Sequence, residues 1–72
     1  SAVRSIQAQM PGGDPEGNVQ GGDEVKAGDP LCVLVAMKME NEIRTPIDGV
    51  VKEVYVNETD KVSVGDKMLV VE

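Results

Sequence analysis

The chain has 72 residues, a net charge of −6 and a single aromatic residue, Tyr55. It carries no basic patch, which argues against nucleic-acid binding, and no apolar run of about 18 residues, which argues against membrane insertion by a helix. With no histidine and one cysteine, it cannot form Ser/His/Asp or Cys/His catalytic arrangements or an internal disulfide.

The cysteine and the carboxylates do not indicate an active site. Cys32 lies in the most apolar stretch of the chain, and we interpret it as a small buried hydrophobic residue rather than as a reactive thiol. The carboxylates form no evident catalytic pair. We therefore expect no independent enzyme, and a protein from a reducing compartment.

The first half of the chain reads as short strands separated by turns. Residues 3–8 alternate, with Ile6 and Ala8 on one face, and predict a strand at the edge of a sheet. Residues 10–13 predict a turn. Residues 14–21 are polar, and Pro15 fits a strand only at an edge or a bulge. Residues 22–30 hold one short apolar spot between turns.

The second half continues in the same way. Residues 31–36 are apolar on both faces, as in a fully buried strand. Residues 39–45 alternate and predict a strand with one face in water. The remaining prediction is a turn at 46–49, a strand at 50–56 with Val50, Lys52, Val54 and Val56 on one face, a turn at 57–60, a strand at 62–64, a turn at 65–66 and a final strand at 68–71.

Residues 31–45 also fit a helix. They contain neither glycine nor proline, and Glu40 and Arg44 are spaced for a helical ion pair. The alternation with period two favours a strand, a turn at Met37–Lys38 and a second strand.

An internal repeat supports the strand reading. When the chain is shifted by 37 positions, Gly12 falls on Gly49, Val25 on Val62 and Asp29 on Asp66. Two copies of one unit predict two interlocked sheets related by a pseudo-twofold. With about four short strands in each copy, we expect an all-β fold, a flattened β-sandwich or barrel.

The two copies join at Ala36-Met37-Lys38-Met39-Glu40. Lys38 has no lysine counterpart, because the shift places it on Ser1. The joint is where the chain departs from its own symmetry, and such departures are expected at functional sites. We interpret Lys38 as an amine displayed on a turn, to which another enzyme attaches a cofactor.

At these residues the chain resembles the biotinyl domains of biotin-dependent carboxylases and decarboxylases, the biotin carboxyl carrier proteins. The shared features are Ala-Met-Lys-Met at 36–39, Gly-Asp-x-Val-x-x-Gly-Asp at 22–29 and Pro-x-x-Gly-x-Val at 46–51. The resemblance covers residues 10–72. It implies a capped, flattened β-barrel of two four-stranded sheets, with the lysine at a hairpin tip far from the termini.

The resemblance also implies the chemistry. A biotin protein ligase would join biotin to Lys38 through an amide bond, with Ala36, Met37 and Met39 as flanking recognition and packing residues. The biotin would carry carboxylate between biotin carboxylase and carboxyltransferase subunits or domains. Met39 is expected to be partly buried and Met37 nearer the surface. We expect residues 1–72 to be one biotinyl domain, the C-terminal part of a longer cytoplasmic chain, or a mitochondrial matrix chain in a eukaryote.

Two features differ from the resemblance or compete with it. Residues 13–18 replace an apolar alternating strand of the family, so we expect an irregular loop or frayed edge there, with lower stability and with apolar positions lost at Asp14 and Pro15. The spacing leaves no room for the protruding thumb of some members. The segment Glu58-Thr59-Asp60-Lys61-Val62 is similar to the lysine motif of lipoyl domains, but the repeat aligns its residues 59–61 with residues 22–24, a turn that leads into a short strand.

Three alternatives stay open at this point. The chain could carry lipoate on Lys61, it could carry lipoate on Lys38, or it could be an unmodified binding module of the same fold. The methionines beside Lys38 favour biotin, because the family resemblance implies acidic neighbours in lipoyl domains.

Overall fold

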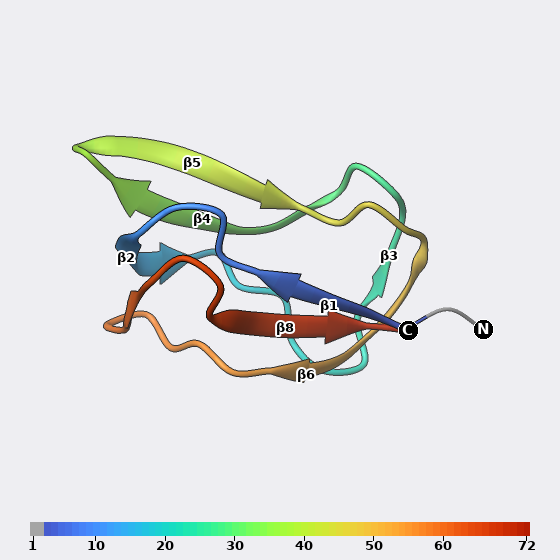
Figure 1. Cartoon of the computed structure of the whole chain (residues 1–72). Helices are drawn as coiled ribbons and strands as arrows, with labels where there is room; N and C mark the ends of the chain where they lie inside the picture. The colour runs from blue at the N-terminus through green and yellow to red at the C-terminus, as the bar shows by residue number, and fades with distance from the viewer. Residues whose placement is uncertain (1–2) are drawn as a thin grey trace.

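The computed structural model describes residues 3–72, which form eight β-strands in two sheets (Figure 1). No helix occurs among these residues, and so none is long and apolar enough to cross a membrane. The strands are β1 (Arg4–Gln7), β2 (Gly12–Glu16), β3 (Glu24–Val25), β4 (Pro30–Ala36), β5 (Met39–Arg44), β6 (Gly49–Val54), β7 (Lys61–Val62) and β8 (Lys67–Val71).

The sheet topology confirms the internal repeat. One sheet has the strand order β1-β8-β6-β3 and the other β5-β4-β2-β7, with every pair antiparallel. A shift of one half onto the other carries β1 onto β5, β2 onto β6, β3 onto β7 and β4 onto β8, which turns the first order into the second. The predicted all-β fold of two four-stranded sheets is therefore confirmed.

The turns before β4 and β8 show why the repeat includes Gly-Asp. The N–H of Lys26 donates to Oδ2 of Asp29 over 2.9 Å, and the N–H of Ser63 donates to Oδ2 of Asp66 over 2.8 Å. The glycines before these aspartates have φ angles of 92° and 90°, which glycine adopts without steric cost. Side chains thus close equivalent turns in both copies.

The core divides into two aliphatic clusters that are copies of each other. Val25, Leu31, Leu69 and Val71 of the first cluster correspond to Val62, Met68, Cys32 and Leu34 of the second. Cys32 is buried, as predicted, and burial raises the pKa of its thiol. A buried thiol with a raised pKa is a poor nucleophile, which supports a packing role.

Strand β2 corrects the prediction for residues 10–18. Instead of a turn through Gly13 and a loose edge, β2 lies between β4 and β7, with Gly13 and Pro15 buried. The pairing shifts between Gly13 and Glu16, which indicates a bulge. At the bulge Asp14 adopts a φ of 49°. Pro15 fits there because a bulged residue needs no hydrogen bond to the neighbouring strand, and its ring occupies a buried, apolar position. Only Asp14 is lost from the core.

A substitution tests the conformation of Asp14. A β-branched residue is poorly compatible with positive φ, so Asp14→Val is expected to lower the free energy of unfolding by about 1–2 kcal/mol. Asp14→Gly is expected to raise it by about 0.5 kcal/mol, because glycine relieves the strain at some entropic cost. Urea unfolding measures both variants, and stabilisation by valine would contradict the bulge.

Three other strand predictions need correction. In β6 the buried residue is Val51, while Lys52 is exposed, because a register shift between Val51 and Glu53 changes the alternation. Val64 is exposed in a turn rather than part of a strand. Residues Val33 and Val35 are half-buried, because β4 has one face only partly covered. Between β2 and β3, residues 17–23 form no strand and so no thumb.

Candidate functional site

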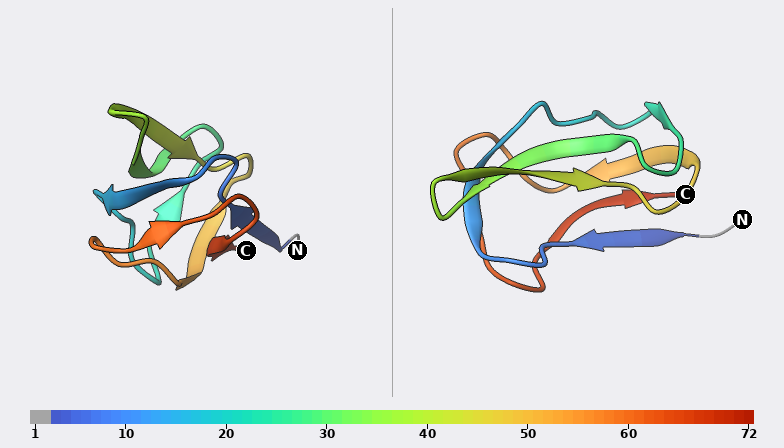
Figure 2. Two further views of the ribbon diagram at one scale, coloured as in Figure 1. Left: turned by 60° about the vertical axis from the view of Figure 1, so that its left-hand side comes forward. Right: turned by 90° about the horizontal axis from the view of Figure 1, so that it is seen from above.

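The predicted hairpin joins the two copies. In the pairing of β4 with β5, Pro30 lies opposite Arg44 at one end and Ala36 lies opposite Met39 at the other. This leaves a two-residue loop of Met37 and Lys38. The hairpin tip lies at the end of the molecule opposite the C-terminus and the start of β1 (Figure 1 and Figure 2). The strand–turn–strand prediction is confirmed, and the helical alternative is wrong.

The loop has the backbone of a type I′ turn. Met37 has a φ of 52° and Lys38 a φ of 64°, and positive φ at both central residues matches the twist of the flanking strands. Asn-Gly is the preferred sequence for this turn. Met-Lys therefore places two side chains in a conformation that costs each of them about 1 kcal/mol or more.

Both loop side chains project into solvent. Met37 is 94% exposed and Lys38 is also exposed, which confirms the prediction for Met37. Met39 is 65% exposed, so the prediction that it is partly buried is wrong. β5 is an edge strand, and the pairing of β2 with β4 reaches no further than Val35. Of the motif, Ala36 alone is buried.

The strain in the turn leads to a testable prediction. Met37→Asn is expected to raise the free energy of unfolding by about 1 kcal/mol, because asparagine tolerates positive φ at the first central position. Met37→Ala keeps the strain and serves as the matched control, with an expected change below about 0.5 kcal/mol. Thermal unfolding measures both, and an equal gain in the two variants would disagree with a type I′ turn.

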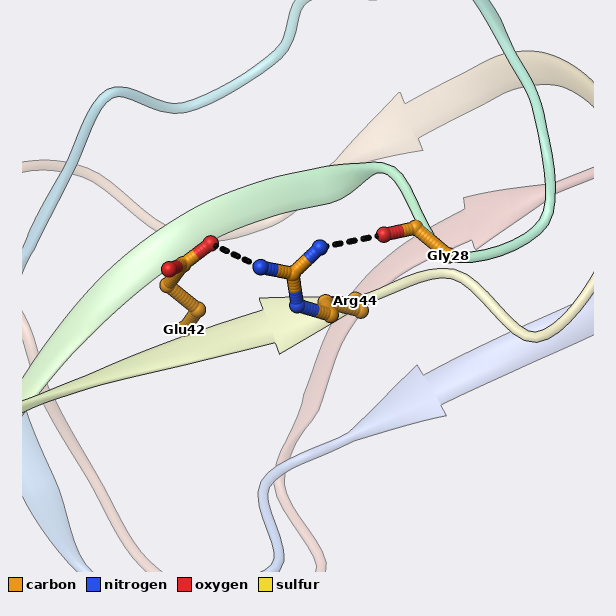
Figure 3. A network of polar contacts seen from close by, with 3 residues as sticks. All are labelled: Gly28, Glu42 and Arg44. Carbon is orange, nitrogen blue, oxygen red and sulfur yellow. Dashed lines mark hydrogen bonds and ion pairs between the residues drawn. The ribbon is translucent and has the colours of Figure 1, made fainter.

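The far end of β5 is fastened by Arg44 (Figure 3). Its Nη1 donates to the carbonyl oxygen of Gly28 over 2.6 Å, and its Nη2 pairs with Oε2 of Glu42 at 2.8 Å. The partner is Glu42, two residues away on the same strand face, and not Glu40 as in a helix. The ion pair is exposed and worth less than about 1 kcal/mol, but the bond to Gly28 ties β5 to the turn before β4.

Lys61 lies elsewhere. It forms β7 together with Val62, after a turn in which the N–H of Asn57 donates to Oδ2 of Asp60 over 2.8 Å. The equivalent turn, from Gln20 to Asp23, has the same hydrogen bond at 2.9 Å. The structure therefore places Lys38, and not Lys61, in the hairpin that joins the copies.

The surroundings of Lys38 offer presentation rather than catalysis. A groove of about 650 Å³ lies between the edge strands β1 and β5, and Lys38 does not line it. The described residues contain no cluster of three His, Cys, Asp or Glu side chains able to hold a metal. Neither of the two salt bridges within residues 3–72 involves Lys38.

Sequence reasoning missed two residues beside the hairpin. The side chain of Asn41 donates hydrogen bonds to carbonyl oxygens of both β4 and β5. The sequence feature that could have indicated this role is an amide residue on the inward face of an alternating strand. Gly12 packs against β4, and a Cβ atom there would lie 2.7 Å from the carbonyl oxygen of Val35. The sequence feature that could have indicated the importance of Gly12 is the repeat, which places Gly49 at the equivalent position.

Comparisons with known proteins agree with this geometry. The family model described as "Biotin-requiring enzyme" matches residues 5–71. The chain is similar to pyruvate carboxylase of Staphylococcus aureus, with 48% identity over 67 residues, covering 93% of this chain and 6% of that protein. It is also similar to the biotin carboxyl carrier protein of Streptococcus mutans, with 38% identity over 71 residues, covering 99% of this chain and 55% of that protein.

Solved structures show the same fold. A single-chain, multi-domain long-chain acyl-CoA carboxylase matches with a TM-score of 0.88 and 31% identity, covering 94% of this chain and 7% of that one. Kluyveromyces lactis urea carboxylase also matches with a TM-score of 0.88, at 26% identity, covering 100% of this chain and 6% of that one. The chain thus spans between 6% and 55% of the length of these relatives. The chain belongs to the family of biotin-requiring enzymes and is a biotinyl domain of that family.

Proposed function

We propose that Lys38 is the residue to which biotin is attached. The observation that carries this proposal is the position of Lys38, exposed in a two-residue turn at the end of the molecule opposite the C-terminus and the start of β1. An amide bond would form between its Nζ and the carboxyl carbon of biotin once ATP has activated that carboxyl group as an acyl adenylate: the bond from the carboxyl carbon to AMP breaks, AMP leaves, and the ammonium loses two protons. The amide bond removes one positive charge from a chain whose net charge is −6.

The chain's own residues supply display and reach. The turn holds the amine clear of both sheets, and Met37 and Met39 offer exposed apolar contacts on either side of it. Exposed methionines are adaptable contact residues. We assign Met37 and Met39, together with the buried Ala36, to recognition by a biotin protein ligase. The ligase must activate the amine, because the described side chains do not enclose it.

The carrier role extends to partners with two active sites. When bound, biotin accepts a carboxyl group at one site and releases it at another. We assign those sites to a biotin carboxylase and a carboxyltransferase, in agreement with the relatives named pyruvate carboxylase and biotin carboxyl carrier protein. We also propose that the chain works in a reducing compartment, the cytoplasm or the mitochondrial matrix in a eukaryote; the single cysteine, Cys32, which can form no internal disulfide, supports this.

A transfer experiment tests this function. Biotinylated chain, verified by mass, is incubated with a biotin carboxylase, ATP and ¹⁴C-bicarbonate, and the protein is then separated from small molecules. We expect label on the biotinylated chain and none on the unmodified chain. A biotinylated chain that stays unlabelled would refute the shuttle. A lipoyl ligase in parallel tests the lipoyl alternative, and lipoate on Lys38 without biotin would favour it.

A further inference from the structure

Asn41 is an unusual residue for its place in β5. It belongs to the inward row of that strand, with Ile43 and Thr45 further along. It is half-buried, although asparagine is among the residues depleted in strands and an apolar residue would pack better there. A residue that breaks a local rule calls for a compensating role.

The contacts of its side chain supply such a role. The Nδ2 group donates to the carbonyl oxygen of Met39 over 3.2 Å and to that of Leu34, across the hairpin, over a longer 3.4 Å. Both partners are acceptors, so the NH₂ end of the amide must face them. One side chain therefore connects β4 with the residue that directly follows Lys38.

The tip of the hairpin has few other supports. β2 pairs with β4 only as far as Val35, and β5 has no strand on its outer side. The turn itself holds two non-glycine residues at positive φ, a conformation that persists only where the surroundings impose it. By the repeat, the counterpart of Asn41 is Arg4 on β1, a charged and exposed residue.

We propose that Asn41 is a positioning residue for the modification of Lys38. Its amide braces the tip and keeps Met37–Lys38 in the turn conformation that the ligase accepts. This inference rests on the proposed function. When a binding-competent conformation is only partly populated, the apparent affinity falls in proportion to its population. Loss of the brace should therefore raise the KM of the ligase for this chain and leave kcat nearly unchanged.

Three variants and a matched control test the brace. Asn41→Ala removes the donor, Asn41→Asp replaces it with a carboxylate facing two carbonyl oxygens, and Asn41→Gln keeps an amide on a longer side chain. Asn57→Asp makes the same charge change in the exposed turn before β7. Each is assayed for KM and kcat with a biotin ligase, and for hydrogen exchange of the backbone amides at 36–41.

The expected result links the two readouts. A neutral hydrogen bond has a net worth of about 1 kcal/mol, so Asn41→Ala should raise KM about fivefold and speed exchange at 36–41 by a similar factor. Asn41→Asp should have a larger effect and Asn41→Gln a smaller one. Exchange at Val51 and Leu69, in the opposite sheet, should stay unchanged, and Asn57→Asp should behave as the wild type.

Two outcomes would overturn the inference. One is a wild-type KM and wild-type exchange in Asn41→Ala. The other is faster exchange at Val51 and Leu69 to the same extent as at the tip, which would mean a general loss of stability. If the wild type accepts no biotin, the proposed function fails, and the exchange rates alone still decide whether Asn41 braces the turn.

Discussion

Leu34→Ala is expected to lower the free energy of unfolding by about 3–4 kcal/mol, from the range measured for fully buried leucines. Leu34 is 0% exposed, belongs to the second core cluster and pairs with Asn41. A domain of this length has a total stability of about 4–10 kcal/mol. The variant should therefore be close to unfolding at 37 °C, and its hairpin should accept less biotin.

A neighbouring residue gives the control for this prediction. Val33 lies on the same strand but is half-buried on the opposite face, so Val33→Ala should cost about 1 kcal/mol. Urea unfolding of the two variants measures the difference. A cost below about 1 kcal/mol for Leu34→Ala would mean that the cluster beneath the hairpin is not closely packed.

Gly12→Ala and Gly49→Ala are each expected to lower the free energy of unfolding by about 2–3 kcal/mol, because an added Cβ would displace backbone. At Gly12 it would lie 2.7 Å from the carbonyl oxygen of Val35, and at Gly49 it would lie 2.6 Å from that of Glu72. These are equivalent contacts of the two copies, which explains why the repeat retains glycine at both positions.

The two glycine variants should differ in their effect on the site. Gly12 contacts β4 two residues before the turn, whereas Gly49 contacts the C-terminal residue at the far end of the molecule. At equal stability loss, Gly12→Ala should therefore reduce biotin acceptance more than Gly49→Ala. Gly21→Ala is the control, because a Cβ there would lie 3.5 Å from Lys52 O, an ordinary contact. If the Gly12 and Gly49 variants accepted biotin equally well, the packing of β2 against β4 would have no influence on the hairpin.

The repeat and the alternation of residues were enough to predict the fold and the position of the hairpin. Each turn has local chemistry that a sequence shows directly, such as Gly28-Asp29 and its copy Gly65-Asp66, and the alternation from Met39 to Thr45 specifies a strand. These signals act over a few residues and are reproduced in both copies, so one copy corroborates the other.

The errors arose where the structure depends on partners distant in the sequence. The bulges at Asp14 and after Val51 each change which residues face the core, and simple alternation cannot detect such a change. The exposure of Met39 depends on how far β2 extends beside β4. The bond from Asn41 to Leu34 depends on the register of the hairpin, which becomes defined only once the turn is known.

The most direct test of Lys38 as the attachment site is the intact mass of the chain after incubation with a biotin ligase, ATP and biotin. The wild type and Lys61→Arg should each gain one biotinyl group, and Lys38→Arg should gain none. Lys61→Arg is the matched control, since it makes the same substitution at the other lysine of interest. A biotinyl group on Lys38→Arg, or none on the wild type, would contradict the account.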